Sequence, residues 1–198
     1  AMGGDHGPES AIPGAAMILK EHPGLRFLIF GDENRIYPLL NRHKDLLAAS
    51  QVRHTDKIVR NDEKPSAALR ASKDTSMRLA IEAVDQGHAQ AVVSSGNTGA
   101  LMAMAKMILK TIPGIHRPAI ASVFPTMKTD TIVLDLGANV LVDAENLAQF
   151  AVLGAVFAKV HKNITLPTVG LLNVGTEDMK GPDHVRGAAA ILSNVDFP

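Results

Sequence analysis

Apolar residues recur along the chain in two patterns, one typical of helices and the other of buried strands. In residues 9–20, Ile12, Ala15, Ala16 and Leu19 are three or four positions apart, which places them on one face of a helix. Similar spacing predicts further helices at 34–43, where Pro38 weakens the pattern, and at 75–86, 100–109, 144–159 and 183–192.

Short apolar runs between these helices predict strands. The clearest is LRFLIF at 25–30, which Gly31 and Asp32 terminate. Other runs predict strands at 52–59, 89–93, 119–124, 131–136 and 168–172. Apolar strands that alternate with helices favour an α/β fold with a mostly parallel sheet covered on both faces. Because neither a repeat nor a low-complexity linker interrupts the pattern, we expect a single α/β domain over residues 1–198.

Four glycine-rich loops have an unusual composition, since each combines glycine with small amides, hydroxyls or carboxylates. They are residues 3–7 (GGDHG), 94–99 (SSGNTG), 135–139 (DLGAN) and 173–177 (NVGTE). In open α/β sheets, ligands bind beyond the carboxyl ends of the strands, where loops lead into helix N-termini that attract anions. One such loop is more often an ordinary turn and helix cap, whereas four together predict a site for a phosphorylated or otherwise anionic ligand.

Composition narrows the choice of partner and chemistry. The 198 residues carry no formal net charge, which gives no electrostatic reason to expect nucleic acid as a partner. The absence of cysteine excludes disulfides, thiolate metal sites and a cysteine nucleophile. No apolar run approaches the roughly 20 residues that span a bilayer. Neither GxxxxGK[ST] nor GxGxxG occurs, so phosphate is supported as a ligand and a nucleotide is not.

Six motifs, in this order along the chain, carry a resemblance to a known family. They are AMGGDHGP, KPSAALRASKDTSM, SSGNTGALMA, HRPAIASVFPT, LDLGANV and LLNVGTEDMKG. The chain resembles the bacterial phosphate acyltransferase of phospholipid synthesis (the PlsX family) from residue 1 to about 181. Members of that family begin with a strand before the first motif and continue well past the NVDF segment near the end of this chain, so we expect this sequence to be a fragment.

The resemblance implies a three-layer α/β/α sandwich, like that of isocitrate and isopropylmalate dehydrogenases, and a homodimer. It implies that acyl carrier protein thioester and orthophosphate react to give acyl phosphate and free carrier protein, with neither metal nor cofactor. It also implies a cytoplasmic protein, with any peripheral membrane contact made through a part of the family's chain outside this sequence.

Candidate residues follow from the needs of this reaction, which are a phosphate cradle and donors for a tetrahedral oxyanion. Asn97 and Thr98, with the amides of Gly96 and Gly99, are the expected cradle or oxyanion donors, although Thr98 could instead simply cap the helix that follows. Asp5 and His6 could orient or deprotonate phosphate, and a turn without chemistry is an equally good interpretation.

Lys180 is the preferred cation for phosphate charge, with a solvated surface lysine as the alternative. Arg70 and Lys73 could bind phosphate or phosphopantetheine, or form an ordinary charged face. Asn139 is a further candidate, although for it and Asp135 the favoured interpretation is that they hold the loop geometry rather than take part in the chemistry. The remaining predicted phosphate contacts are Gly4, Gly7, Ser95, Asn173, Gly175 and Thr176.

Other functions stay open at this point. A phosphate acetyltransferase that acts on acetyl-coenzyme A would share the fold and reaction type. A decarboxylating dehydrogenase would need convergent carboxylates for a divalent metal, and no such cluster is evident in the sequence. A non-catalytic module that senses phosphate or phospholipid would bind the anion without turning over a thioester.

Overall fold

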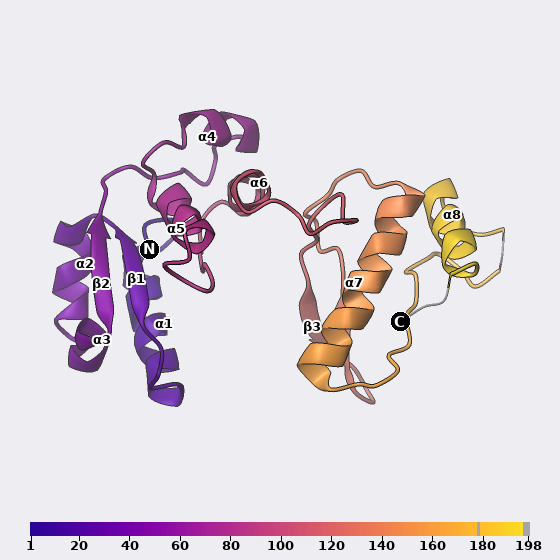
Figure 1. The fold of residues 1–198 in the computed structure, drawn as a ribbon, viewed down its shortest axis with the longest axis horizontal. Helices are drawn as coiled ribbons and strands as arrows, with labels where there is room; N and C mark the ends of the chain where they lie inside the picture. Colours follow the sequence, from indigo (N-terminus) through magenta and orange to yellow (C-terminus); the bar gives the residue numbers. More distant parts are fainter. Residues whose placement is uncertain (178, 196–198) are drawn as a thin grey trace. The chain divides into compact units, whose positions relative to one another are not determined.

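The computed structural model describes residues 1–177 and 179–195, so Asp178, inside the motif LLNVGTEDMKG, and the segment from Asp196 onward lie outside it. The chain divides into two compact units, Ala1–Lys110 and Thr111–Pro198 (Figure 1). The helices are α1 (Pro8–Glu21), α2 (Glu33–Leu40), α3 (Lys44–Ala48), α4 (Pro65–Ala71), α5 (Ser76–Asp85), α6 (Thr98–Ile108), α7 (Ala144–Lys162) and α8 (Asp183–Leu192). The strands are β1 (Phe27–Gly31), β2 (Ser50–His54), β3 (Ser122–Pro125) and β4 (Asp130–Val133).

The first unit contains a parallel pair of strands. β1 lies beside β2 with Ile29 opposite Val52. Residues 32–49, which include α2 and α3, make the long crossover that parallel strands require. The first residues of the chain lie against β1. The amino group of Ala1 donates to Phe30 O at 2.9 Å, and the side chain of Met2 is buried.

Two clusters of buried side chains form the core of the first unit. One joins α1, α2 and α3 to β1 through Ile12, Ile29, Ile36, Leu40 and Leu46. The other joins α4, α5 and α6 through Ala68, Met77, Ile81, Ala100 and Met104. The second cluster fixes the start of α6, and with it the turn at residues 94–99 that the sequence predicts as a binding loop.

In its described residues, the second unit contains a hairpin and two helices. β3 and β4 pair antiparallel, with Val123 opposite Ile132. Only residues 126–129 separate these strands, far fewer than the dozen or so that a parallel connection needs. α7 packs against α8 through small side chains, since Ala148, Ala151 and Ala188 are buried.

The fold is therefore α/β, as the sequence predicts, but the sheets of the described residues are small and only one of them is parallel. The predicted strands at 89–93 and 168–172 do not form within the described residues. A strand requires a hydrogen-bonded neighbour, and neither segment lies beside one here. The predicted helices all form, while the short helices α3 and α4 were not predicted. The expectation of a single domain over 1–198 stays a prediction.

Candidate functional site

Two of the four predicted loops meet in the first unit. Ser95 Oγ donates to the carbonyl oxygen of Gly3 at 3.1 Å, although 92 residues separate the two. Gly4 has φ +83°, and a Cβ atom at this position would lie 2.5 Å from Ser95 O. Glycine is required there both for its conformation and for the close backbone contact. The opening loop and the 94–99 turn are thus held together by the Ser95 hydroxyl and by a close approach of their backbones.

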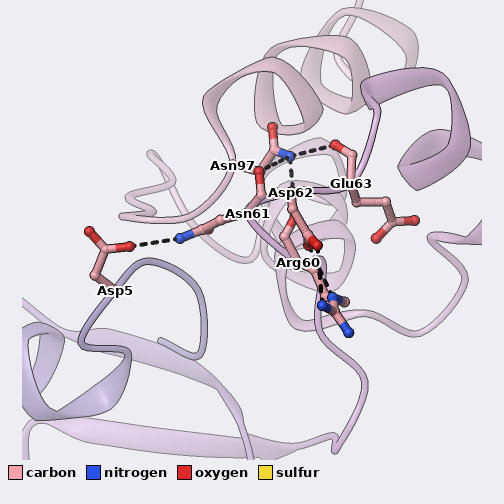
Figure 2. A network of polar contacts seen from close by, with 6 residues as sticks. All are labelled: Asp5, Arg60, Asn61, Asp62, Glu63 and Asn97. Atoms are coloured by element: carbon pink, nitrogen blue, oxygen red, sulfur yellow. Dashed lines mark hydrogen bonds and ion pairs between the residues drawn. The ribbon is translucent and has the colours of Figure 1, made fainter.

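Asn97 connects this turn to a third segment, residues 60–63. Its Nδ2 lies 3.2 Å from Arg60 O, 3.2 Å from Asn61 O and 2.8 Å from Glu63 O (Figure 2). Its Oδ1 accepts from the backbone N–H of Ala100 at 3.0 Å, which makes Asn97 the N-cap of α6. Thr98, which the sequence offers as an alternative cap, is the first residue of the helix and is exposed.

Segment 60–63 in turn reaches the acidic residue of the opening loop. Asn61 Nδ2 donates to Asp5 Oδ1 at 3.1 Å (Figure 2). Asp5 and His6 are both exposed, and no partner of Asp5 Oδ2 is found in the described part of the chain. One carboxylate oxygen is therefore held by an amide while the other is free to accept a proton or a hydrogen bond from a ligand.

The charged residues of segment 60–63 pair locally. Arg60 Nε lies 3.0 Å from Asp62 Oδ1, and both side chains are more than two-thirds exposed. The guanidinium of Arg60 hydrogen-bonds the carboxylate and so lowers the pKa of Asp62, while Asp62 raises the pKa of Arg60. A pair this exposed adds little stability, but it keeps a cation in the segment that holds Asp5.

The N-terminus of α6 is the predicted anion cradle. A Cβ at Gly99 would lie 2.8 Å from Pro65 Cγ, so the start of α4 packs closely on the start of α6. The amide of Gly96 donates to Ser94 Oγ at 3.2 Å, so this predicted cradle donor already has a partner. The first turn of α6, at Thr98 and Gly99, still directs backbone N–H groups and the positive end of the helix dipole outward.

The other two predicted loops belong to the second unit, where side chains hold each loop in shape. The Asp135 carboxylate accepts from the backbone N–H groups of Ile120, Ala138 and Asn139, at 2.8, 3.2 and 2.8 Å, and from Asn139 Nδ2 at 2.9 Å. This geometry matches the interpretation that Asp135 and Asn139 shape their loop.

In the 173–181 loop, Asn173 Nδ2 donates to Lys180 O at 3.1 Å, and Gly175 lies against the side chain of Lys180. Arg186 in α8 donates to Gly181 O at 3.0 Å, which ties the loop to that helix. Lys180 and Thr176 are both exposed.

Two comparisons with known proteins bear on this site. The family model described as "Fatty acid synthesis protein" matches residues 1–197. The chain belongs to this family. Its resemblance to the phosphate acyltransferases is confirmed by curated relatives that carry that name.

Three of these relatives show how far the likeness extends. "Phosphate acyltransferase" of Rhodospirillum centenum is 55% identical over 97% of this chain and 54% of its own length. The protein of the same name from Parvibaculum lavamentivorans is 52% identical over 100% of this chain and 55% of its own length. That from Rhodospirillum rubrum is 50% identical over 100% of this chain and 57% of its own length. The chain spans about half the length of the curated relatives it matches.

Some predicted residues of this family member lie outside the network around Asp5. Arg70 lies in the last turn of α4 and donates through Nε to Ser66 O at 3.2 Å, and Lys73 lies exposed in the turn before α5. No contact among the described residues joins either of them to Asp5 or Asn97. Arg60 and Asn61 were not predicted from the sequence, because their run RNDE matches no motif and its only signal is its place just before KPSAALRASKDTSM.

The described residues contain no group of three or more histidine, aspartate or glutamate side chains arranged to hold a metal ion. None of the helices in the described ranges is both long and apolar enough to cross a membrane.

Proposed function

We propose that the full-length protein transfers a fatty acyl group from an acyl carrier protein thioester to orthophosphate, giving acyl phosphate for phospholipid synthesis. The family description and the names of the relatives support this activity. The observation that carries it is the meeting of the opening loop with the 94–99 turn. This meeting places the exposed carboxylate of Asp5 in the same hydrogen-bonded network as the residue that caps α6.

The chemistry needs no cofactor. A phosphate oxygen attacks the thioester carbonyl carbon, forming a C–O bond and a tetrahedral oxyanion. The C–S bond then breaks, and the thiolate leaves with the electron pair and takes up a proton. Because a thiol with a pKa near 8.5 is a good leaving group, a strong general acid is unnecessary. The protein has to hold phosphate in line and stabilise the oxyanion.

In the first unit, Asp5 accepts the proton of phosphate or orients it, and His6 beside it contributes a second polar group. The N–H groups at the start of α6 and the hydroxyl of Thr98 serve as donors to phosphate or the oxyanion. In the second unit, Lys180 is the proposed cation for phosphate charge, with Asn173, Gly175 and Thr176 in its loop. Asn139, Arg70 and Lys73 stay secondary candidates.

The proposal extends to the whole protein. We expect a three-layer α/β/α sandwich of the isocitrate and isopropylmalate dehydrogenase type, to which the parallel β1–β2 pair would belong. We also expect a cytoplasmic homodimer in which this chain is part of one α/β domain. Acyl carrier protein is the expected partner.

The test is turnover by the full-length protein with palmitoyl carrier protein and phosphate, with acyl phosphate trapped as its hydroxamate. We expect turnover, and a loss of about 10²–10⁴-fold in kcat/KM for Asp5→Asn, the usual contribution of a proton-transfer group. Asp85→Asn removes an exposed carboxylate at the end of α5 and should leave kcat/KM unchanged. Full activity of Asp5→Asn would reject the role given to Asp5.

The same assay separates the alternatives. Faster turnover of acetyl-coenzyme A than of the palmitoyl carrier protein would identify a phosphate acetyltransferase instead. Calorimetric binding of phosphate without turnover of either thioester would identify a binding module.

A further inference from the structure

We propose that Asn61 and Asn97 are positioning residues that together hold the carboxylate of Asp5, and that Asn97 does not itself donate to the substrate. This inference rests on the proposed function, in which Asp5 acts on phosphate. It assigns a role to segment 60–63, which no motif of the sequence marks, and it changes the role that the sequence suggests for Asn97.

The contact between Asn61 and Asp5 cannot persist by itself. Both side chains are exposed, and 56 residues separate them along the chain. Water competes for both groups at such a surface, so the 3.1 Å hydrogen bond has a low net value unless the backbone already places the two side chains together. The opening loop is placed by the hydrogen bond from the Ser95 hydroxyl to Gly3 O, and segment 60–63 therefore needs an anchor of its own.

Asn97 supplies that anchor. A side-chain amide has two N–H hydrogens, and here three carbonyl oxygens of segment 60–63 surround the nitrogen at 2.8–3.2 Å. Its oxygen is occupied as the N-cap of α6. Both ends of the side chain are thus used inside the protein, which leaves no side-chain N–H of Asn97 directed at a ligand.

The neighbours of the segment anchor its ends but not its centre. Val59 is buried in the cluster of α4, α5 and α6, and Pro65 packs on Gly99. Between them, the backbone N–H of Glu63 donates to Arg60 O at 3.2 Å, which makes a turn whose carbonyl groups face Asn97. Removing the amide of Asn97 therefore frees the turn that carries Asn61, while the ends of the segment stay in place.

The hydrogen bond from Asn61 fixes the direction in which the carboxylate of Asp5 points. With Oδ1 held by Asn61, the rotation of the carboxylate is restricted and Oδ2 faces away from the amide that holds its partner oxygen (Figure 2). A held carboxylate meets phosphate in one orientation, whereas a free one would have to be ordered at each turnover.

A double-mutant cycle in the full-length protein tests this coupling. We expect Asn61→Ala to lower kcat/KM for phosphate roughly 5- to 30-fold, which lies within the range of a lost coupling between contacting groups, with KM for the acyl carrier protein thioester unchanged. In the Asp5→Asn background the same substitution should change kcat/KM less than twofold, because the residue it positions is already disabled. Asn61→Gln, which keeps the amide donor, should recover most of the loss.

Asn97→Ser is the second arm, because serine keeps a cap for α6 but lacks the amide hydrogens. We expect a similar loss of activity, faster hydrogen exchange at residues 60–63 and unchanged exchange at Ala100. Adding Asn61→Ala to Asn97→Ser should bring little further loss. Asp62→Ala, which breaks only the exposed pair with Arg60, is the matched control and should retain activity.

The outcomes separate the two claims. If Asp5→Asn is impaired but Asn61→Ala has normal kinetics, or if the two losses simply multiply, the positioning role is wrong and the proposed function stands. If Asp5→Asn is fully active, the role of Asp5 fails and this inference fails with it. Thermal melting of each variant shows whether a loss reflects unfolding, and the recovery in Asn61→Gln distinguishes a lost donor from a disturbed loop.

Discussion

At the scale of single residues, the site depends on close contacts, such as that of Gly4 with Ser95, where a larger side chain would not fit. Two loops approach each other at Gly3, Gly4 and Ser95, through backbone atoms and the Ser95 hydroxyl, and the side-chain amide of Asn97 bonds to the turn at residues 60–63. The glycine-rich composition of the loops is visible in the sequence. Which residues each glycine faces is not, because the partners are about 90 positions away.

Gly4 allows a sharp test of this close approach. Gly4→Ala should destabilise the protein more than Gly87→Ala, measured by urea unfolding. Both glycines have positive φ, +83° and +72°, so both substitutions strain the backbone. Only at Gly4 would the new Cβ also meet another backbone atom, Ser95 O, at 2.5 Å, while nothing lies within 4 Å at Gly87. Equal losses in the two variants would show that the loops separate easily.

The ion pair between α1 and α2 gives a pH-dependent prediction. Arg35 Nη2 lies 3.0 Å from Glu9 Oε2, and its hydrogen bond lowers the pKa of Glu9 below the ordinary value. The pair therefore contributes stability above the pKa of the unfolded carboxyl and loses it as the pH falls through the lower pKa of the folded state. Both groups are exposed, so the contribution to stability is small.

Arg35→Gln should raise the pKa of Glu9 toward its ordinary value, as followed by the carboxyl carbon shift in an NMR titration. The lowered pKa of Asp62, which depends on Arg60, should stay unchanged in this variant and serves as the control. An unaltered Glu9 titration would mean that the pair does not persist in solution.

At the scale of secondary-structure elements, helices were predicted far better than strands. The helix at 183–192 has the predicted bounds, and those at α1, α5 and α7 differ by only a few residues. A helix satisfies its hydrogen bonds within itself, so a local apolar period is enough to locate it. A strand needs a neighbour, and no local pattern shows whether segments such as 89–93 have one.

The N-cap residue Thr75 shows how much a local helix-start signal contributes to stability. Its buried hydroxyl accepts from the Arg78 N–H at 3.4 Å as the N-cap of α5, and donates to Ser72 O at 2.8 Å. Thr75→Ala should lower the free energy of unfolding by about 1–2 kcal/mol in urea denaturation. Thr75→Ser keeps the hydroxyl and should lose much less. Similar losses in both variants would point to packing of the methyl group instead.

At the scale of the whole molecule, the structure is organised as two compact units joined near Lys110. Both buried clusters that define the first unit lie before this residue. Residues 109–121 contain neither helix nor strand, and Lys110 is exposed with φ +64°. Exposed backbone of this kind between compact units is where proteases cut first.

Limited trypsin digestion of the chain should therefore cut first after Lys110, giving fragments of residues 1–110 and 111–198 by mass spectrometry. Lys106 lies within α6 and should be protected. Lys110→Gln should delay the appearance of both fragments. An earlier cut at Lys57 or Arg60 would show instead that the segment holding Asp5 opens more readily than the connection.

In the candidate site, too, some features depend on residues that are neighbours in the sequence and others on contacts between residues far apart in it. From the residues alone came the α/β class, the helices, the glycine-rich loops and the family resemblance, because each depends on neighbours in sequence. The pairing of Asp5 with Asn61, and the contacts of the Asn97 amide with the carbonyl groups of segment 60–63, came from tertiary structure. The antiparallel direction of β3 and β4 could have been inferred from their short connection. The contacts of Asn97 could not, since a side-chain amide bonds to whichever backbone carbonyls the fold brings to it, and no pattern in the sequence records them.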